Sequence, residues 1–203
     1  MPYLAIVRHG VSQANVDGLI AGHTDTPLTE KGRSQARLAA ELLADIPFHA
    51  AHGSTLRRAH HTLEEIVAAL NLPIEIVLHD DLRERNWGEL EGKYSDNRNH
   101  DFTEEESALW KTFEARPPGG ESYADVSQRI VRYFDQHVLP QLLAGKNVLL
   151  VGHNGSLKTL QRHLEDIPHS ETCNLQLGNA EAKVYLFEIG KVVSVETRSI
   201  HKK

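Results

Sequence analysis

The chain has 203 residues, of which 40% are hydrophobic and 25% are charged, a composition typical of soluble globular proteins. Its formal net charge of −6 argues against a nucleic-acid or anionic-membrane partner, and its single cysteine, Cys173, excludes an internal disulfide. Without a secretory leader or an apolar stretch of roughly 20 residues, the sequence predicts a cytoplasmic protein that has no membrane anchor.

Strands and helices alternate along the first part of the chain. The apolar run ending at Arg8 predicts a buried strand over residues 4–8. Thr29 is the expected N-cap of the first helix. Residues 50–53 predict a short strand, and residues 56–70 predict a helix whose apolar side chains recur at helical spacing.

The second part follows the same alternation. Residues 74–78 predict a strand, and the polar segment 93–118 is expected to form a cap inserted between core elements. Ser122 begins a long helix through Leu143, which Pro140 bends or divides. The remaining predicted elements are a buried strand at 147–151, a helix ending near Leu164, and a closing hairpin of residues 184–189 and 192–197.

This alternation predicts one domain over residues 1–203. The expected fold class is α/β, a three-layer α/β/α sandwich with a mostly parallel central sheet. In such a sheet, ligands bind beyond the carboxyl ends of the strands. Polar residues at strand ends therefore indicate where the functional site lies.

The two most apolar predicted strands each end in a histidine beside a glycine. His9 precedes Gly10, and His153 follows Gly152. Both histidines would project at the same edge of a parallel sheet. Arg8 adds a planar fork of donors that matches phosphate oxygens, and the helix after His153 adds free N–H groups. The pattern predicts phosphate chemistry performed by an imidazole.

Two further segments add charged groups at element ends. Arg57 and Arg58 lie at a strand-to-helix junction, and Glu84 lies among arginines after the third strand. Other phosphate chemistries lack their motifs. The residue six positions after Cys173 is Asn179 instead of the arginine of a cysteine phosphatase, and no phosphate-cradling P-loop or metal-ligand spacing occurs. We therefore expect no metal and no cofactor.

Over its whole length the chain resembles the histidine phosphatase superfamily, which includes the cofactor-dependent phosphoglycerate mutases. The matching motifs are Arg8-His9-Gly10 with Ser12 and Asn15, Asp25-Thr26-Pro27-Leu28-Thr29 with Gly32, Ser54-x-Leu56-x-Arg58-Ala59-x-x-Thr62, Glu84-x-x-x-Gly88-x-x-x-Gly92, Pro117-Pro118-Gly119-Gly120-Glu121-Ser122, and Gly152-His153-x-Gly155.

The resemblance implies a phosphoglycerate mutase-like fold and a role for each site residue. His9 would be the nucleophile that forms a phosphohistidine, and Glu84 would be the general acid. The groups expected around the phosphoryl oxygens are Arg8, Arg58 and His153. The expected substrate-binding residues are Asn15, Ala21, Gly22, Asn154 and Lys111, with Lys111 and Arg98 as candidates for a second anionic group or as solvated surface cations.

Departures from the mutase pattern favour hydrolysis of a phosphomonoester. Where mutases carry threonine, tryptophan and lysine, the matching residues here are Ala21, Ala14 and Ser95, and Lys111-Thr112 replaces the Arg-Arg pair. The predicted activity is that of a metal-independent phosphatase of the histidine acid phosphatase type, acting on a small phosphorylated metabolite.

Two alternatives stay open. A phosphoglycerate mutase that depends on 2,3-bisphosphoglycerate is favoured by residues 139–164, which resemble the mutases closely. A non-catalytic module that binds a phospho-ligand is disfavoured because every catalytic residue of the family is present. The sequence leaves the formation of a homodimer open.

Overall fold

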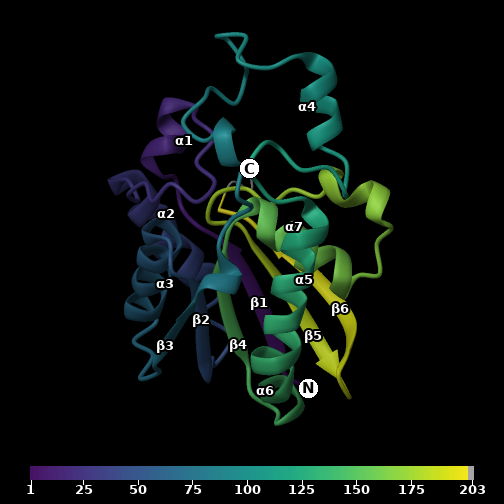
Figure 1. Cartoon of the computed structure of the whole chain (residues 1–203). Helices are drawn as coiled ribbons and strands as arrows, with labels where there is room; N and C mark the ends of the chain where they lie inside the picture. The colour runs from purple at the N-terminus through teal and green to yellow at the C-terminus, as the bar shows by residue number, and fades with distance from the viewer. Residues whose placement is uncertain (201–203) are drawn as a thin grey trace.

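Six strands form one mixed sheet in the computed structural model, which describes residues 1–200 (Figure 1). Their spatial order is β3-β2-β4-β1-β5-β6. The first four of these run parallel, and β5 is antiparallel to both of its neighbours. The predicted α/β class and the closing hairpin are confirmed. The strands are β1 Tyr3–Arg8, β2 Ala50–Ser54, β3 Ile76–His79, β4 Val148–Gly152, β5 Ala182–Glu188 and β6 Lys191–Arg198.

Helices cover both faces of this sheet, as expected for three layers. Helices α2 and α3 pack on one face, and α5, α6 and α7 pack on the other. Among residues 1–200, no helix is long and apolar enough to cross a membrane. The helices are α1 Gln13–Asp17, α2 Glu30–Leu42, α3 Arg57–Ala69, α4 Glu104–Trp110, α5 Tyr123–Tyr133, α6 Leu139–Leu143 and α7 Asn154–Leu164.

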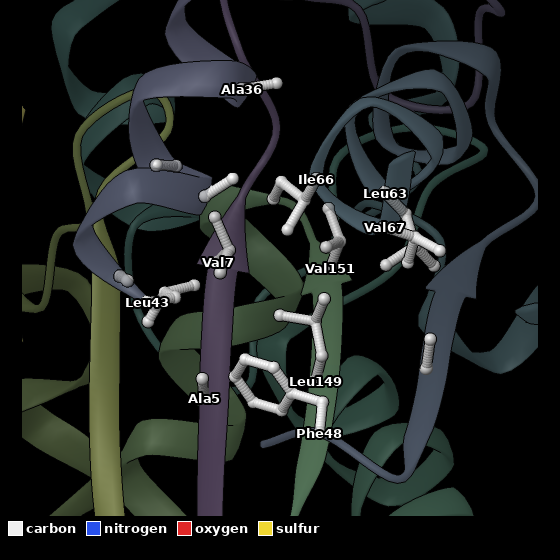
Figure 2. Packing of buried hydrophobic residues seen from close by; sticks show 14 of the residues in the cluster. Ala5, Val7, Ala36, Leu43, Phe48, Leu63, Ile66, Val67, Leu149 and Val151 are labelled. Carbon is white, nitrogen blue, oxygen red and sulfur yellow. The ribbon is translucent and has the colours of Figure 1, made fainter. Parts of the chain in front are cut away.

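The two helical layers explain why residues 4–7 of β1 and 148–151 of β4 are all apolar. Figure 2 shows Ala5 and Val7 of β1 beside Leu149 and Val151 of β4, on the face covered by α2 and α3. The intervening residues of both strands belong to the second cluster, together with Ile130 and other side chains of the α5–α7 layer. A strand buried on both faces reads as a continuous apolar run.

The predicted long helix is divided into three segments. Ser122 caps it as expected, with its hydroxyl accepting from the Asp125 N–H, but α5 ends at Tyr133. A π-helical turn over Phe134–Val138 follows, and α6 begins directly after it with Pro140 in its first turn. Proline fits there because the first turn of a helix needs no intrahelical N–H bond.

The carboxyl ends of the parallel strands gather at one edge of the sheet. Arg8 at the end of β1 pairs with Gly152 at the end of β4, so His9 and His153 leave the sheet side by side. Segment 93–118, which contains α4, lies over this edge at the top of Figure 1. We call it the cap segment.

His52 on β2 is a buried histidine outside this edge. Its Nδ1 lies 2.7 Å from the Tyr133 hydroxyl, and the Gln141 amide donates to its Nε2 at 3.1 Å. Burial lowers the pKa of His52 below the ordinary histidine value of 6.5. Protonation is therefore easier in the unfolded chain, which gains protons relative to the folded state as the pH falls below 6.5.

We predict that replacing His52 by Gln flattens the acid side of the stability curve. The wild-type free energy of unfolding falls below pH 6.5, with at most about 1.4 kcal/mol per pH unit contributed by one histidine. Urea unfolding between pH 7.5 and pH 5 measures this slope. His100→Gln, at an exposed position in the cap segment, is the matched control. A slope that is the same in His52→Gln and in wild type would contradict the prediction.

Candidate active site

His9 is held as a neutral imidazole directly after β1. Its Nδ1–H donates to the Gly10 carbonyl at 2.7 Å, which leaves the lone pair on Nε2. The side chain is only 4% exposed. Burial, together with the charges of Arg58 and Arg8, lowers the pKa of His9 well below its ordinary value. A neutral ring with a free Nε2 lone pair is what a nucleophilic histidine requires.

His153 lies against His9 at the end of β4. The two ring centroids are 5.1 Å apart, and the rings meet edge to face at 60°. Burial, reinforced by the Arg58 charge, lowers the pKa of His153 well below its ordinary value. Within residues 1–200, neither buried ring nitrogen of His153 has a hydrogen-bond partner. Because buried polar groups are nearly always paired, these nitrogens indicate a position for a polar ligand.

Arg58, in the first turn of α3, is fixed by backbone carbonyls. Its Nη1 donates to the Thr24 carbonyl at 2.9 Å and its Nη2 to the Gly22 carbonyl at 2.7 Å. The side chain is 1% exposed, so its charge acts in a medium from which water is largely excluded. Its neighbour Arg57 instead binds the Asp25 carboxylate and is exposed.

The loop that holds Arg58 is itself held by Glu91. One carboxylate oxygen of Glu91 accepts from the His23 N–H at 2.7 Å, and the other accepts from the N–H and the hydroxyl of Thr24, both at 2.8 Å. Gly22 has φ +49°, and a Cβ there would overlap this carboxylate. Gly22 and Ala21 therefore contribute backbone, with the Ala21 carbonyl accepting from the Thr24 N–H at 2.8 Å. Glu91 was missed at the sequence level, although it lies within the Glu84–Gly92 motif.

Arg8 and the backbone of His9 are held by the loop before β5. Arg8 Nη1 donates to the Leu177 carbonyl at 2.8 Å, and its buried Nε has no partner within residues 1–200. The Asn179 amide donates to the His9 carbonyl at 3.0 Å and to Asn15 Oδ1 at 3.2 Å. Asn15 is exposed on α1 and is linked to His9 through Asn179, a residue that no sequence motif indicated.

Glu84 lies at the N-terminus of α7. Its Oε1 accepts from the N–H groups of Arg85 at 2.7 Å and Ser156 at 3.1 Å, and its Oε2 accepts from Gly155 at 3.0 Å. A Cβ at position 155 would overlap the Glu84 carboxylate. Gly155 therefore lets the carboxylate approach the free N–H groups of the helix.

A pocket of about 340 Å³ lies between Arg8 and Glu84 at the sheet edge and the cap segment, and His9, Arg58 and His153 are not among its lining residues. Arg8, Glu84 and Asn154 line it from the sheet edge, and Lys111 lines it from the cap segment. The side-chain oxygen of Asn154 accepts from the Leu177 N–H at 3.2 Å. The other lining residues are Ile20, Trp87, Leu90, Ser95, Phe102, Ser107 and Trp110.

Two other cations near the cap segment are already bound. Arg98 does not line the pocket, because its guanidinium group binds Asp96 at 2.8 Å and lies 4.3 Å from the Tyr94 ring centroid. Arg85 is fully buried and donates to three backbone carbonyls, those of Trp110, Ala115 and Glu121. Arg85 thus connects the carboxyl-terminal part of the cap segment to the chain segment that carries Glu84. No sequence motif indicated this role.

No group of three or more His, Cys, Asp or Glu side chains within residues 1–200 is arranged to hold a metal ion. The arrangement offers instead the neutral imidazole of His9 with a free Nε2 lone pair, the guanidinium groups of Arg8 and Arg58, and the unpaired imidazole of His153. The carboxylate of Glu84 lies at the pocket wall. Such a set can accept a phosphoryl group and stabilise the charge on its oxygens.

We predict that Glu91→Ala weakens the binding of inorganic phosphate by roughly tenfold or more. Loss of the carboxylate frees loop 22–24, so Arg58 loses its carbonyl partners, and one bond to a charged group is worth about 1.5–3 kcal/mol. Calorimetric titration with phosphate measures the affinity. Glu89→Ala, an exposed neighbour, is the matched control. Unchanged phosphate affinity in Glu91→Ala would show that this loop does not position Arg58.

Comparison with known proteins agrees with this geometry. A model of the histidine phosphatase superfamily (branch 1) matches residues 4–198. The 2,3-bisphosphoglycerate-dependent phosphoglycerate mutase 2 of Gloeobacter violaceus is 41% identical over 169 residues, which are 82% of this chain and 77% of that protein.

Solved structures of phosphatases share the fold. A mycobacterial glucosyl-3-phosphoglycerate phosphatase superimposes with a TM-score of 0.80 and 28% identity, over 98% of this chain and 96% of its own. The alpha-ribazole phosphatase of Shigella flexneri gives a TM-score of 0.78 and 28% identity, over 94% and 93% of the two chains. The protein therefore belongs to the histidine phosphatase superfamily.

Proposed function

We propose that the protein hydrolyses phosphomonoesters of small metabolites through a phosphohistidine on His9, without a metal ion or an organic cofactor. The observation that carries this proposal is the His9 tautomer, which leaves the Nε2 lone pair free in a buried site beside two guanidinium groups. Cations of this kind stabilise the transferring phosphoryl group.

The proposed reaction has two displacements at phosphorus. His9 Nε2 attacks phosphorus, a P–N bond forms, and the ester P–O bond breaks as Glu84 donates a proton to the leaving oxygen. Water then attacks the phosphohistidine while Glu84 takes one of its protons, which releases inorganic phosphate and restores His9. Arg8, Arg58 and His153 bind the phosphoryl oxygens in both steps.

In this mechanism Glu84 has to leave part of its present hydrogen-bond network. Both of its carboxylate oxygens accept backbone N–H groups at or beside the start of α7. Delivery of a proton to a leaving group therefore requires the carboxyl group to give up at least one of these bonds. The bonds also fix the position to which the carboxylate returns after each step.

The charges around the pocket favour hydrolysis over mutase activity. A phosphoglycerate mutase must retain a bisphosphorylated intermediate, which requires cations for a carboxylate and a second phosphate. The basic side chains that line the pocket are Arg8 and Lys111, whereas Arg85 and Arg98 are bound to groups of the protein.

Mutase activity that depends on 2,3-bisphosphoglycerate is the second candidate. The observation that favours it is the 41% identity to the Gloeobacter violaceus protein of that name, compared with 28% for the two phosphatases. A non-catalytic binding module is disfavoured because His9, Glu84 and His153 are all present: the rings of His9 and His153 lie against each other, and Glu84 lines a pocket together with Arg8.

A panel of phosphomonoesters tests the proposal, with phosphate release measured beside a phosphoglycerate interconversion assay primed with 2,3-bisphosphoglycerate. We expect phosphate release to dominate and rapid quenching to trap an acid-labile phosphohistidine. His9→Ala abolishes both signals because the P–N bond has no acceptor. His100→Ala, an exposed histidine of the cap segment, retains both.

Two outcomes would reject this reading. Interconversion of phosphoglycerates that greatly exceeds phosphate release would identify a mutase. Turnover by a folded His9→Ala variant at the wild-type rate would exclude the covalent mechanism itself.

For Glu84→Gln we predict a loss that depends on the leaving group. An alkyl alkoxide needs a proton to depart, so hydrolysis of alkyl phosphates falls about 10²-fold or more, whereas 4-nitrophenyl phosphate is affected far less. The measurement is kcat/KM over a series of esters of graded leaving-group acidity. Glu89→Gln serves as the control, and equal slowing across the series would contradict the role of Glu84 as general acid.

A further inference from the structure

Five apolar side chains, three of them aromatic, form one part of the pocket wall, away from Arg8 and Glu84. Trp87, Phe102 and Trp110 line it together with Ile20 and Leu90. The chain has only two tryptophans, and both lie in this wall. The pocket therefore offers ring faces and aliphatic surface to the organic part of a phosphate ester.

The aromatic side chains are fixed before a ligand arrives. The rings of Phe102 and Trp110 meet edge to face with centroids 5.6 Å apart, and Trp110 is 7% exposed. The Arg85 guanidinium group lies 4.3 Å from the centroid of the Trp87 ring. The Asn97 side chain binds both the N–H and the carbonyl of Phe102, at 3.2 Å and 2.5 Å. Preorganised rings lose little side-chain entropy when they bind a ligand.

Besides Arg8 and Glu84, four polar side chains line the pocket, and two of them are already bonded to the protein backbone. The Ser95 hydroxyl donates to the Gly18 carbonyl at 3.0 Å, and the Asn154 side-chain oxygen accepts from Leu177. Ser107 and the exposed Lys111 remain. A sugar ring with several hydroxyls would find few partners for its polar atoms, and Lys111 is the one cation of the cap segment that lines the pocket and could meet a second anionic group.

We propose that the organic part of the substrate is a planar, uncharged aromatic or heteroaromatic ring that packs against Trp87, Phe102 and Trp110. This inference rests on the proposed function for the phosphate end of the ligand. The volume of about 340 Å³ is at the lower end of small-molecule pockets and suits one or two fused rings. Phe102 and Trp110 are then specificity-determining residues contributed by the cap segment.

The binding test uses His9→Ala protein, so that it does not depend on turnover. Calorimetry compares benzyl phosphate, glycerol 3-phosphate, glucose 6-phosphate and 3-phosphoglycerate, and fluorescence excited at the tryptophans reports contact with the wall. We expect benzyl phosphate to bind at least tenfold more tightly than the others and to change the fluorescence. Equal or tighter binding of 3-phosphoglycerate or glucose 6-phosphate would overturn the proposal.

Variants of the cap segment assign the effect to the ring wall. Phe102→Leu should weaken benzyl phosphate binding about fivefold, Phe102→Tyr should restore it, and inorganic phosphate should bind all variants equally. Leu109→Ala is the matched control, because Leu109 lies on α4, is 56% exposed and does not line the pocket. Loss of benzyl phosphate and inorganic phosphate affinity together in Phe102→Leu would contradict a role in ring recognition.

Experiments with the wild-type enzyme distinguish failure of the proposed hydrolase activity from failure of the proposed ring recognition. If no ester releases phosphate but benzyl phosphate still binds most tightly, the hydrolase assignment fails and the ring pocket stands. If phosphate is released with the same kcat/KM from benzyl phosphate and from glycerol 3-phosphate, hydrolysis stands and ring recognition is wrong. Both esters have alkyl leaving groups, so their need for a proton from Glu84 is matched.

Discussion

The structure around the site depends on holding three arginines in fixed positions, Arg58 and Arg85 buried and Arg8 partly buried, without neutralising their charge. Arg8, Arg58 and Arg85 are held by backbone carbonyls, one for Arg8, two for Arg58 and three for Arg85. A carboxylate in their place would cancel the charge, whereas a carbonyl dipole orients the guanidinium group and leaves its net charge intact. Most of the carbonyls that hold the arginines belong to loop 22–24, the loop before β5 and the end of the cap segment, so these segments must lie close to the site.

The same arrangement explains why the histidines stay neutral. Burial is the main cause that lowers the pKa of His9 and His153, and the neighbouring arginine charges lower it further. The arginines therefore supply charge for an anion and also keep the nucleophile unprotonated. The proposed phosphate site thus carries the positive charges of Arg8 and Arg58, whereas the cap segment contributes the rings of Phe102 and Trp110 and a single cation, Lys111, to the pocket.

The sequence predicted the parts of this architecture that leave a local pattern. Apolar runs located the central strands, and strand-end residues indicated where His9, His153 and Arg8 meet. Glu91 and Asn179 were missed because they act on backbone atoms far away in the chain, and a carbonyl acceptor has no residue type by which it could be recognised. The long helix through Leu143 was predicted to bend or divide at Pro140, but the break begins earlier, in the π-helical turn over Phe134–Val138, and no proline or glycine within that turn signals it.

The contacts of β1 bear on the order in which the site forms during synthesis. The partner of Arg8 at Leu177 lies 169 positions further along the chain, and Asn179 lies 170 positions after His9. Strand β1 also lacks one of its two neighbours until β5 pairs with it. During synthesis His9, the proposed nucleophile, is therefore made long before Leu177 and Asn179, which orient it and the neighbouring Arg8. We therefore expect the proposed phosphate site to be completed only after the loop before β5 has been made and β5 has paired with β1.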